Sequence, residues 1–166
     1  MDRLFQEIAV AIANRLYFLA LLAALAIPDM CAGLQSGDGL SNGKRYEEWF
    51  DRWMGPRGYA GWVSGEDCWG LRCSLLHQGV LHPHRGRYSR VMFVEPQPSG
   101  NVFHRVVMND ALDLDIPTFC GDLIRSAQEW LSTVDGSPTY AKNLGRFLAR
   151  HPNGIPPYIV GAPVIG

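Results

Sequence analysis

An arginine and a histidine, Arg72 and His77, share the segment DCWGLRCSLLHQG at residues 67–79. Wound as a helix at about 100° per residue, this segment spreads its leucines and cysteines over one broad apolar arc with Arg72 near the centre. His77 falls about 140° further round, on the flank of that arc. Arginine binds anions through paired N–H groups and histidine exchanges protons near neutral pH, so the pair has the side chains needed for acid–base chemistry on an anion.

A charged side chain on a face meant for burial needs a partner, because an unpaired buried charge costs several kcal/mol. Two arrangements would satisfy Arg72. In the first, an acid of another helix, such as Asp29 or Asp51, forms a structural ion pair with it. In the second, the apolar face is a subunit contact, and a two-fold axis brings two copies of Arg72 and His77 together at the floor of a cleft.

The stretch RCSLLH, residues 72–77, resembles the Arg-x4-His motif of the HEPN superfamily of small α-helical proteins. The resemblance implies a homodimer and a metal-independent endoribonuclease of the kind found in toxin–antitoxin, defence and RNA-processing systems. In that chemistry His77 takes the proton of a ribose 2′-OH, which attacks the adjacent phosphate, and the second copy of His77 protonates the leaving 5′-oxygen. Arg72 stabilises the pentacoordinate phosphorus and Glu66, on the same helical flank as His77, orients the imidazole. The product is a 2′,3′-cyclic phosphate, and no cofactor or metal takes part.

Two other functions remain open at this point. Some HEPN domains are catalytically inactive and serve as RNA-binding or protein-binding modules, and Cys73 stands where the nucleases often have Asn or Asp. Cys73 with His77, His82 and His84 also offers ligands for a metal-dependent hydrolase, although no pair has the spacing of a known zinc module. The chain does not have the spacing of a phosphate-binding loop.

A basic stretch follows the motif, since residues 82–105 carry four arginines against one glutamate, a local net charge of +3. Cations interleaved with an aromatic side chain are suited to RNA phosphates near the cleft. The candidate RNA contacts are Arg85, Arg87, Tyr88, Arg90, His104 and Arg105. Charged side chains also protect an exposed strand edge from pairing, which requires no ligand. Residues 109–135 carry a net charge of −5, and a basic face beside an acidic face would equally suit the docking of two copies.

The composition is that of one globular domain, residues 1–166, with 47% hydrophobic and 19% charged residues. A formal net charge of −1 gives the whole molecule no general affinity for nucleic acid. The four cysteines include no C-x-x-C pair, which predicts buried, reduced thiols in a cytoplasmic protein. The apolar run at 16–27 is shorter than the roughly 20 residues that span a bilayer, so we expect a core helix and no membrane. The expected partners are a second copy of the chain, RNA, and a cognate antitoxin or other protein.

Hydrophobic spacing and capping residues predict five helices. Their ranges are 3–27, ended by Pro28, then 44–54, Ser64 to about Gly79, 118–134, and Ser137 to about Arg150. Runs rich in Val, Phe and Tyr at 87–95 and 101–108 predict a β-hairpin with a longer loop. Residues 151–166 are rich in Pro and Gly, which predicts an extended tail. The expected fold is therefore mainly α, a HEPN-like helical bundle with an inserted β-hairpin at about 87–108.

Overall fold

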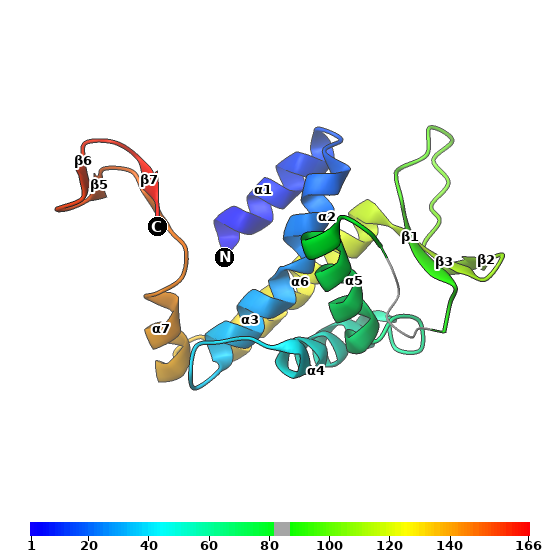
Figure 1. The fold of residues 1–166 in the computed structure, drawn as a ribbon, viewed down its shortest axis with the longest axis horizontal. Helices are drawn as coiled ribbons and strands as arrows, with labels where there is room; N and C mark the ends of the chain where they lie inside the picture. Colours follow the sequence, from blue (N-terminus) through cyan, green and yellow to red (C-terminus); the bar gives the residue numbers. More distant parts are fainter. Residues whose placement is uncertain (82–86) are drawn as a thin grey trace.

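The computed structural model of the chain describes residues 1–81 and 87–166, and most of its regular structure is α-helical. The helices are α1 (Asp2–Ala13), α2 (Tyr17–Leu25), α3 (Ile27–Gln35), α4 (Gly43–Met54), α5 (Gly65–Gln78), α6 (Ile116–Val134) and α7 (Pro138–Leu144), with a 3-10 turn, η1, at Gly55–Arg57. Figure 1 shows the helices gathered in the middle of the molecule, a small sheet at one end of the long axis and the C-terminal segment at the other. The prediction of a mainly α fold is confirmed.

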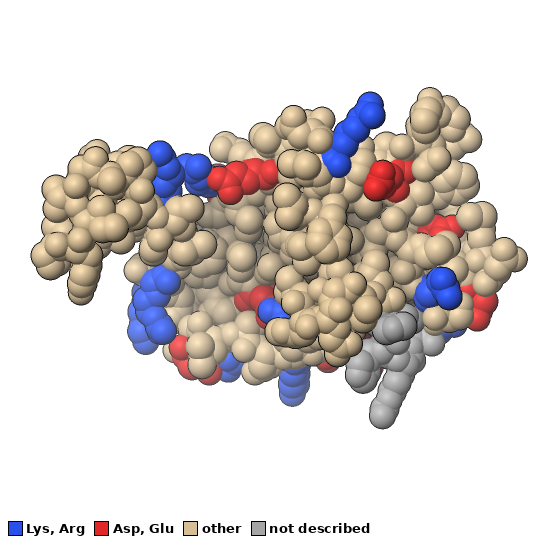
Figure 2. All heavy atoms as spheres, turned by 45° about the horizontal axis from the view of Figure 1, so that its top comes forward, with Lys and Arg blue, Asp and Glu red and all other residues tan. Residues whose placement is uncertain are grey.

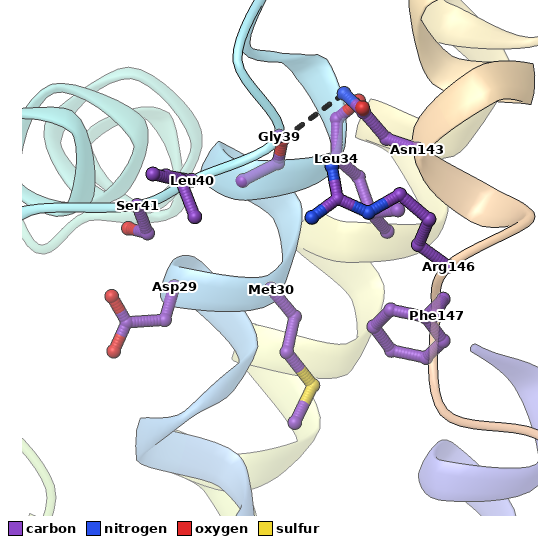
Figure 3. Close-up of a pocket in the computed structure, with 10 residues that line it drawn as sticks. Asp29, Met30, Leu34, Gly39, Leu40, Ser41, Asn143, Arg146 and Phe147 are labelled. Atoms are coloured by element: carbon purple, nitrogen blue, oxygen red, sulfur yellow. Dashed lines mark hydrogen bonds between the residues drawn. The ribbon is translucent and has the colours of Figure 1, made fainter. Parts of the chain in front are cut away.

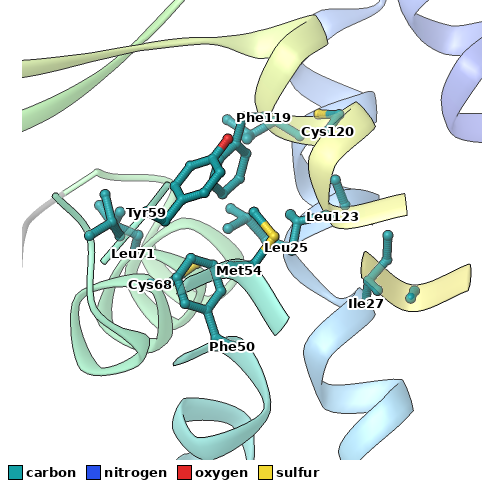
Figure 4. Packing of buried hydrophobic residues seen from close by; sticks show 14 of the residues in the cluster. Leu25, Ile27, Phe50, Met54, Tyr59, Cys68, Leu71, Phe119, Cys120 and Leu123 are labelled. Carbon is teal, nitrogen blue, oxygen red and sulfur yellow. The ribbon is translucent and has the colours of Figure 1, made fainter. Parts of the chain in front are cut away.

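The core lies where α6 packs against α2, α3 and α4, and where α5 closes over α2 and α4. Helix α4 turns its aromatic residues inward at helical spacing, because Tyr46, Trp49 and Phe50 recur every three or four positions and are fully buried. Figure 4 shows Phe50 and Met54 of α4 meeting Leu25 of α2 and Leu123 of α6 in this cluster. The apolar burial of this cluster holds the helices that carry the candidate site.

Helix α5 begins after Ser64, as predicted, with a capping box formed by Ser64 and Asp67. The Ser64 side chain accepts from the Asp67 N–H at 3.1 Å, and the Asp67 carboxylate accepts from the Ser64 N–H at 3.1 Å. At the other end Gly79 adopts the left-handed conformation that closes the helix. Gly65 lies so close to α4 that a Cβ there would come within 2.4 Å of the Glu47 carbonyl oxygen. Only glycine lets the two helices approach this closely.

The N-terminal helix is not continuous as predicted. The helix is interrupted at Asn14–Leu16, where Arg15 has a positive φ of 59°, and α2 begins at Tyr17. Pro28 does not end a helix; it occupies the first turn of α3, where a missing N–H costs nothing. The stretch Tyr17–Gln35 is the one described segment with the length and apolarity to cross a membrane, and more than half of it is buried inside the fold. Such burial is what a core helix requires.

The predicted pairing of 87–95 with 101–108 is wrong. The sheet has the order β1 (Arg90–Val94), β3 (Ala111–Asp115), β2 (Val106–Met108), with β1 parallel to β3 and β2 antiparallel to it. The hairpin joins β2 to β3 through Asn109 and Asp110, which both have the positive φ of a two-residue turn. Strand β3 then runs directly into α6, whose first turn is capped by the Asp115 carboxylate. The inserted element is therefore a three-stranded sheet built around β3.

The last helix is shorter than predicted, and the C-terminal tail contains strand pairs where an extended segment was expected. Helix α7 ends at Leu144 and does not reach Arg150, because Gly145 follows as its C-cap. The tail forms two short antiparallel pairs, β4 (Arg150–His151) with β7 (Val164–Ile165) and β5 (Gly154–Ile155) with β6 (Ile159–Val160). Figure 2 shows this end of the molecule as a largely uncharged lobe, while charged side chains are spread singly over the rest of the visible face.

Candidate functional site

Arg72 lies on the inner side of α5, where side chains of its own chain hold the guanidinium. Its Nη2 forms an ion pair with Oδ2 of Asp29 in α3 at 2.7 Å, and its guanidinium carbon lies 5.0 Å from the centre of the Trp69 ring. The side chains of Arg72 and Asp29 are 21% and 15% exposed, so water screens the pair only in part. Of the two expected arrangements, the structure contains the first, with Asp29 as the acid.

Half of the apolar face of α5 is covered within the chain. Cys68, Leu71 and Leu75 are buried against α2 and α4, whereas Leu76 is 43% exposed. The three buried residues therefore pack inside the chain, and a subunit contact through the rest of this face stays a prediction. Asp51, the other acid considered for Arg72, instead accepts from the Gly65 N–H at 2.7 Å and fastens the start of α5 to α4.

Part of the Arg72 guanidinium keeps its donor capacity. Nε has no hydrogen-bond partner among the described residues, and Nη1 reaches only the Cys73 sulfur, at 4.0 Å. Asp29 also lines a hollow of about 230 Å³ between α3, the α3–α4 loop and the end of α7 (Figure 3). Arg72 thus has its position fixed by one carboxylate and one aromatic ring, while its buried Nε has no acceptor among the described residues.

His77 and Glu66 are both exposed, at opposite ends of α5. His77 lies in the last turn and Glu66 in the first, eleven residues apart, which is about 16 Å along a helix axis. The prediction that Glu66 orients the His77 imidazole is therefore wrong within one chain, because a shared angular position does not overcome the axial separation. Between Arg72 and His77 the axial separation is about 7.5 Å, and the two positions lie about 140° apart around the helix, with Arg72 on the inner side and His77 exposed.

The predicted RNA contacts divide into two groups. Arg87 and Arg90 are exposed, and Arg87 donates from Nη1 to the Gly61 carbonyl at 3.0 Å while its guanidinium lies 5.8 Å from the Tyr88 ring centre. With Trp62, Arg87 and Tyr88 line a hollow of about 400 Å³ beside β2. Arg85 lies outside the described residues.

His104 and Arg105 belong to the body of the fold. The Tyr59 hydroxyl donates to Oδ2 of Asp122 in α6 at 2.9 Å and lies 3.2 Å from Nε2 of His104. The Arg105 guanidinium lies 5.6 Å from the Tyr59 ring centre and donates to the Arg57 carbonyl at 3.0 Å. His104 Nε2 and Arg105 Nη1 are therefore engaged within the fold, and the role of these two residues as RNA contacts stays a prediction.

Burial sets the protonation of this cluster. Burial and the nearby Asp122 carboxylate raise the pKa of Tyr59 far above its ordinary value, so the hydroxyl stays protonated and remains a donor. Burial, reinforced by the Arg105 charge, lowers the pKa of His104, so its imidazole is neutral at pH 7. Sequence spacing gave no sign of this cluster, since Tyr59, His104 and Asp122 come from three distant segments.

The metal-binding hypothesis finds no cluster to support it in the described part of the chain. Residues 1–81 and 87–166 contain no group of three or more His, Cys, Asp or Glu side chains placed to hold a metal ion. His82 and His84, on which that hypothesis depends, lie outside the described residues. Cys73 is partly exposed on α5, and burial raises the pKa of the two buried thiols of Cys68 and Cys120 to about 12, which keeps both protonated.

A comparison with protein-family models finds no match, and comparisons with curated proteins and with solved structures find no similar chain.

Proposed function

We propose that the chain is a HEPN-like, metal-independent endoribonuclease in which Arg72 binds the scissile phosphate and His77 transfers the proton. The observation that carries this proposal is the setting of Arg72. Asp29 and Trp69 hold its guanidinium, while Nε and Nη1 lack strong acceptors among the described residues. A fixed, partly exposed guanidinium whose Nη1 lacks a strong acceptor is suited to a phosphate, and the exposed His77 follows at the end of the same helix.

The proposed reaction is balanced without a metal. The ribose 2′-oxygen forms a bond to phosphorus as His77 removes its proton, and the bond from phosphorus to the 5′-oxygen breaks. A second His77, from another copy of the chain, protonates the leaving oxygen, so the active species is a homodimer. Because Cys68, Leu71 and Leu75 of α5 are buried within the chain, the two copies would meet through the exposed flank that carries Leu76 and His77. Glu66 has no part in the reaction.

The RNA strand would be held by Arg87, Tyr88 and Arg90, with Trp62 offering a ring for base stacking. Free cysteine thiols support a cytoplasmic location, where such a nuclease would act in defence, as a toxin with a cognate antitoxin, or in RNA processing.

Cleavage of RNA by the purified protein in excess EDTA tests the proposal. Wild type should leave 2′,3′-cyclic phosphate ends on RNA and should not cut DNA, which has no 2′-OH. His77→Ala should lower the rate by about 10²–10⁴-fold, the usual contribution of a general acid–base residue. Gln78→Ala, the neighbouring exposed position, is the matched control and should cut normally. Cleavage that survives in His77→Ala, or that EDTA abolishes, would contradict the proposed mechanism.

One observation favours a second function, a catalytically silent module that binds RNA or a protein partner. Asp29 already neutralises Arg72 inside the chain, as a purely structural arginine requires. In that case wild type and His77→Ala would both fail to cut RNA and would bind it equally well.

A further inference from the structure

The hollow beside Asp29 has walls of different chemical character. Met30 and Leu34 of α3 form its floor, Leu40 stands on one side, and Arg146 with Phe147 stands on the other, just beyond α7 (Figure 3). Its volume of about 230 Å³ is below the roughly 300–1,000 Å³ of drug-sized pockets, so it suits one compact ring system. An apolar floor beside an aromatic side chain favours a flat, weakly polar group.

Arg146 supplies a cation at the edge of this hollow. Figure 3 shows its guanidinium extending over the hollow from the end of α7. No acid pairs with Arg146 among the described residues, and its side chain is exposed. On the opposite side the Asp29 carboxylate is already paired with Arg72. The charge that the hollow presents to a ligand is therefore positive.

Two buried polar atoms at the hollow have no hydrogen-bond partner among the described residues. They are Oδ1 of Asn143 and Oγ of Ser41. The Asn143 side chain is 95% buried (5% exposed), and its Nδ2 donates to the carbonyls of Leu34 and Ser36 at 3.0 and 2.8 Å, which orients the amide. Gly39 lies against this amide, since a Cβ there would be 2.9 Å from Oδ1 and 3.3 Å from Nη1 of Arg146. An orphaned acceptor therefore lies next to an unpaired cation.

From this combination we infer that the hollow binds a nucleoside monophosphate unit. The base packs on Met30 and Phe147, an N–H of its edge donates to Asn143 Oδ1 after a small shift of Gly39, and the phosphate pairs with Arg146. The source is either a free mononucleotide or one nucleotide of an RNA strand. In the second case the subsite rests on the proposed function, and Asp29 joins it to Arg72, which holds the adjacent phosphate.

Titration with AMP, GMP, CMP and UMP, followed by calorimetry or NMR, tests the subsite. At least one nucleotide should bind, and inorganic phosphate and the matching nucleoside should bind at least tenfold more weakly, because each makes only half of the contacts. Arg146→Gln should weaken nucleotide binding about tenfold or more while leaving the thermal midpoint unchanged, because Arg146 is exposed. Lys142→Gln, which removes the same charge from the last turn of α7 at a residue that does not line the hollow, should bind like wild type.

The two sources are separated by competition. A short single-stranded RNA, added to the His77→Ala protein so that it stays intact, should displace the nucleotide if the strand is the source. Failure to displace identifies the free nucleotide. Absence of binding up to millimolar nucleotide, equal binding of inorganic phosphate, or binding unaffected by Arg146→Gln would overturn the subsite. RNA cleavage without nucleotide binding would overturn the subsite alone, and nucleotide binding without cleavage would overturn the nuclease alone.

Discussion

Replacing Asp29 by asparagine should reveal how much the fold depends on the ion pair with Arg72. The substitution keeps the volume of the side chain and removes only its charge, so Arg72 is left as a partly buried cation. Removing one partner of a fully buried pair costs about 3–5 kcal/mol. Because the two side chains retain 21% and 15% of their exposure, and because the Trp69 ring still faces the guanidinium, we expect a loss of about 2–3 kcal/mol.

Chemical denaturation of wild type and Asp29→Asn measures this loss directly. For a chain of 166 residues the expected loss corresponds to a fall in the thermal midpoint of about 4–12 °C. The double variant Asp29→Asn with Arg72→Met should recover most of the loss, because it no longer buries an unpaired charge. Glu7→Gln, which breaks the exposed Arg3–Glu7 pair on α1, is the control and should change stability by less than about 0.5 kcal/mol. A loss below 0.5 kcal/mol in Asp29→Asn, or no recovery in the double variant, would refute this reasoning.

Three further predictions concern the rest of the fold. Asp113 is buried in β3 with no hydrogen-bond partner for either oxygen among the described residues, and burial raises its pKa. Asp113→Asn should therefore stabilise the protein in urea at pH 7, and the gain should shrink as the pH falls toward 4, where the unfolded state also begins to take up the proton; an equal gain at both values would contradict this account. His104 has a lowered pKa, so wild type should lose stability as the pH falls from 7 toward 5, and His104→Gln should lose less over the same range; parallel pH profiles would count against a buried neutral imidazole. Gly65→Ala should cost about 1–3 kcal/mol by forcing α5 away from Glu47, while Gly55→Ala, which meets no atom within 4 Å, should be nearly neutral; similar midpoints for the two variants would exclude a close helix approach.

Several elements could be read from local sequence because their determinants are local. The capping box at Ser64 and the glycine at 79 set the ends of α5, and the spacing of Tyr46, Trp49 and Phe50 set α4. The turn at Asn109 and Asp110 is also a local signal, and it marks the β2–β3 hairpin that the sequence analysis placed elsewhere.

The pairing of β1 with β3 could not be read in this way. Parallel strands are joined by a long connection, which leaves no local turn signal between β1 and β3. The runs at 87–95 and 101–108 both have a strand-like composition, and composition does not tell whether they pair with each other or with a third strand. Hydrophobic patterning predicts that these runs are extended. Which strands become neighbours depends on how the sheet packs against the helices.

The candidate site divides along the same line. The sequence by itself determined that Arg72 and His77 lie on one helix, that Arg72 faces inward and that it needs a partner. Tertiary structure alone decided that Asp29 is that acid, that Glu66 is too distant from His77, and that His104 is held by Tyr59. The physical reason is that helical periodicity is a property of neighbouring residues, whereas the partner of a buried charge is set by how separate helices pack.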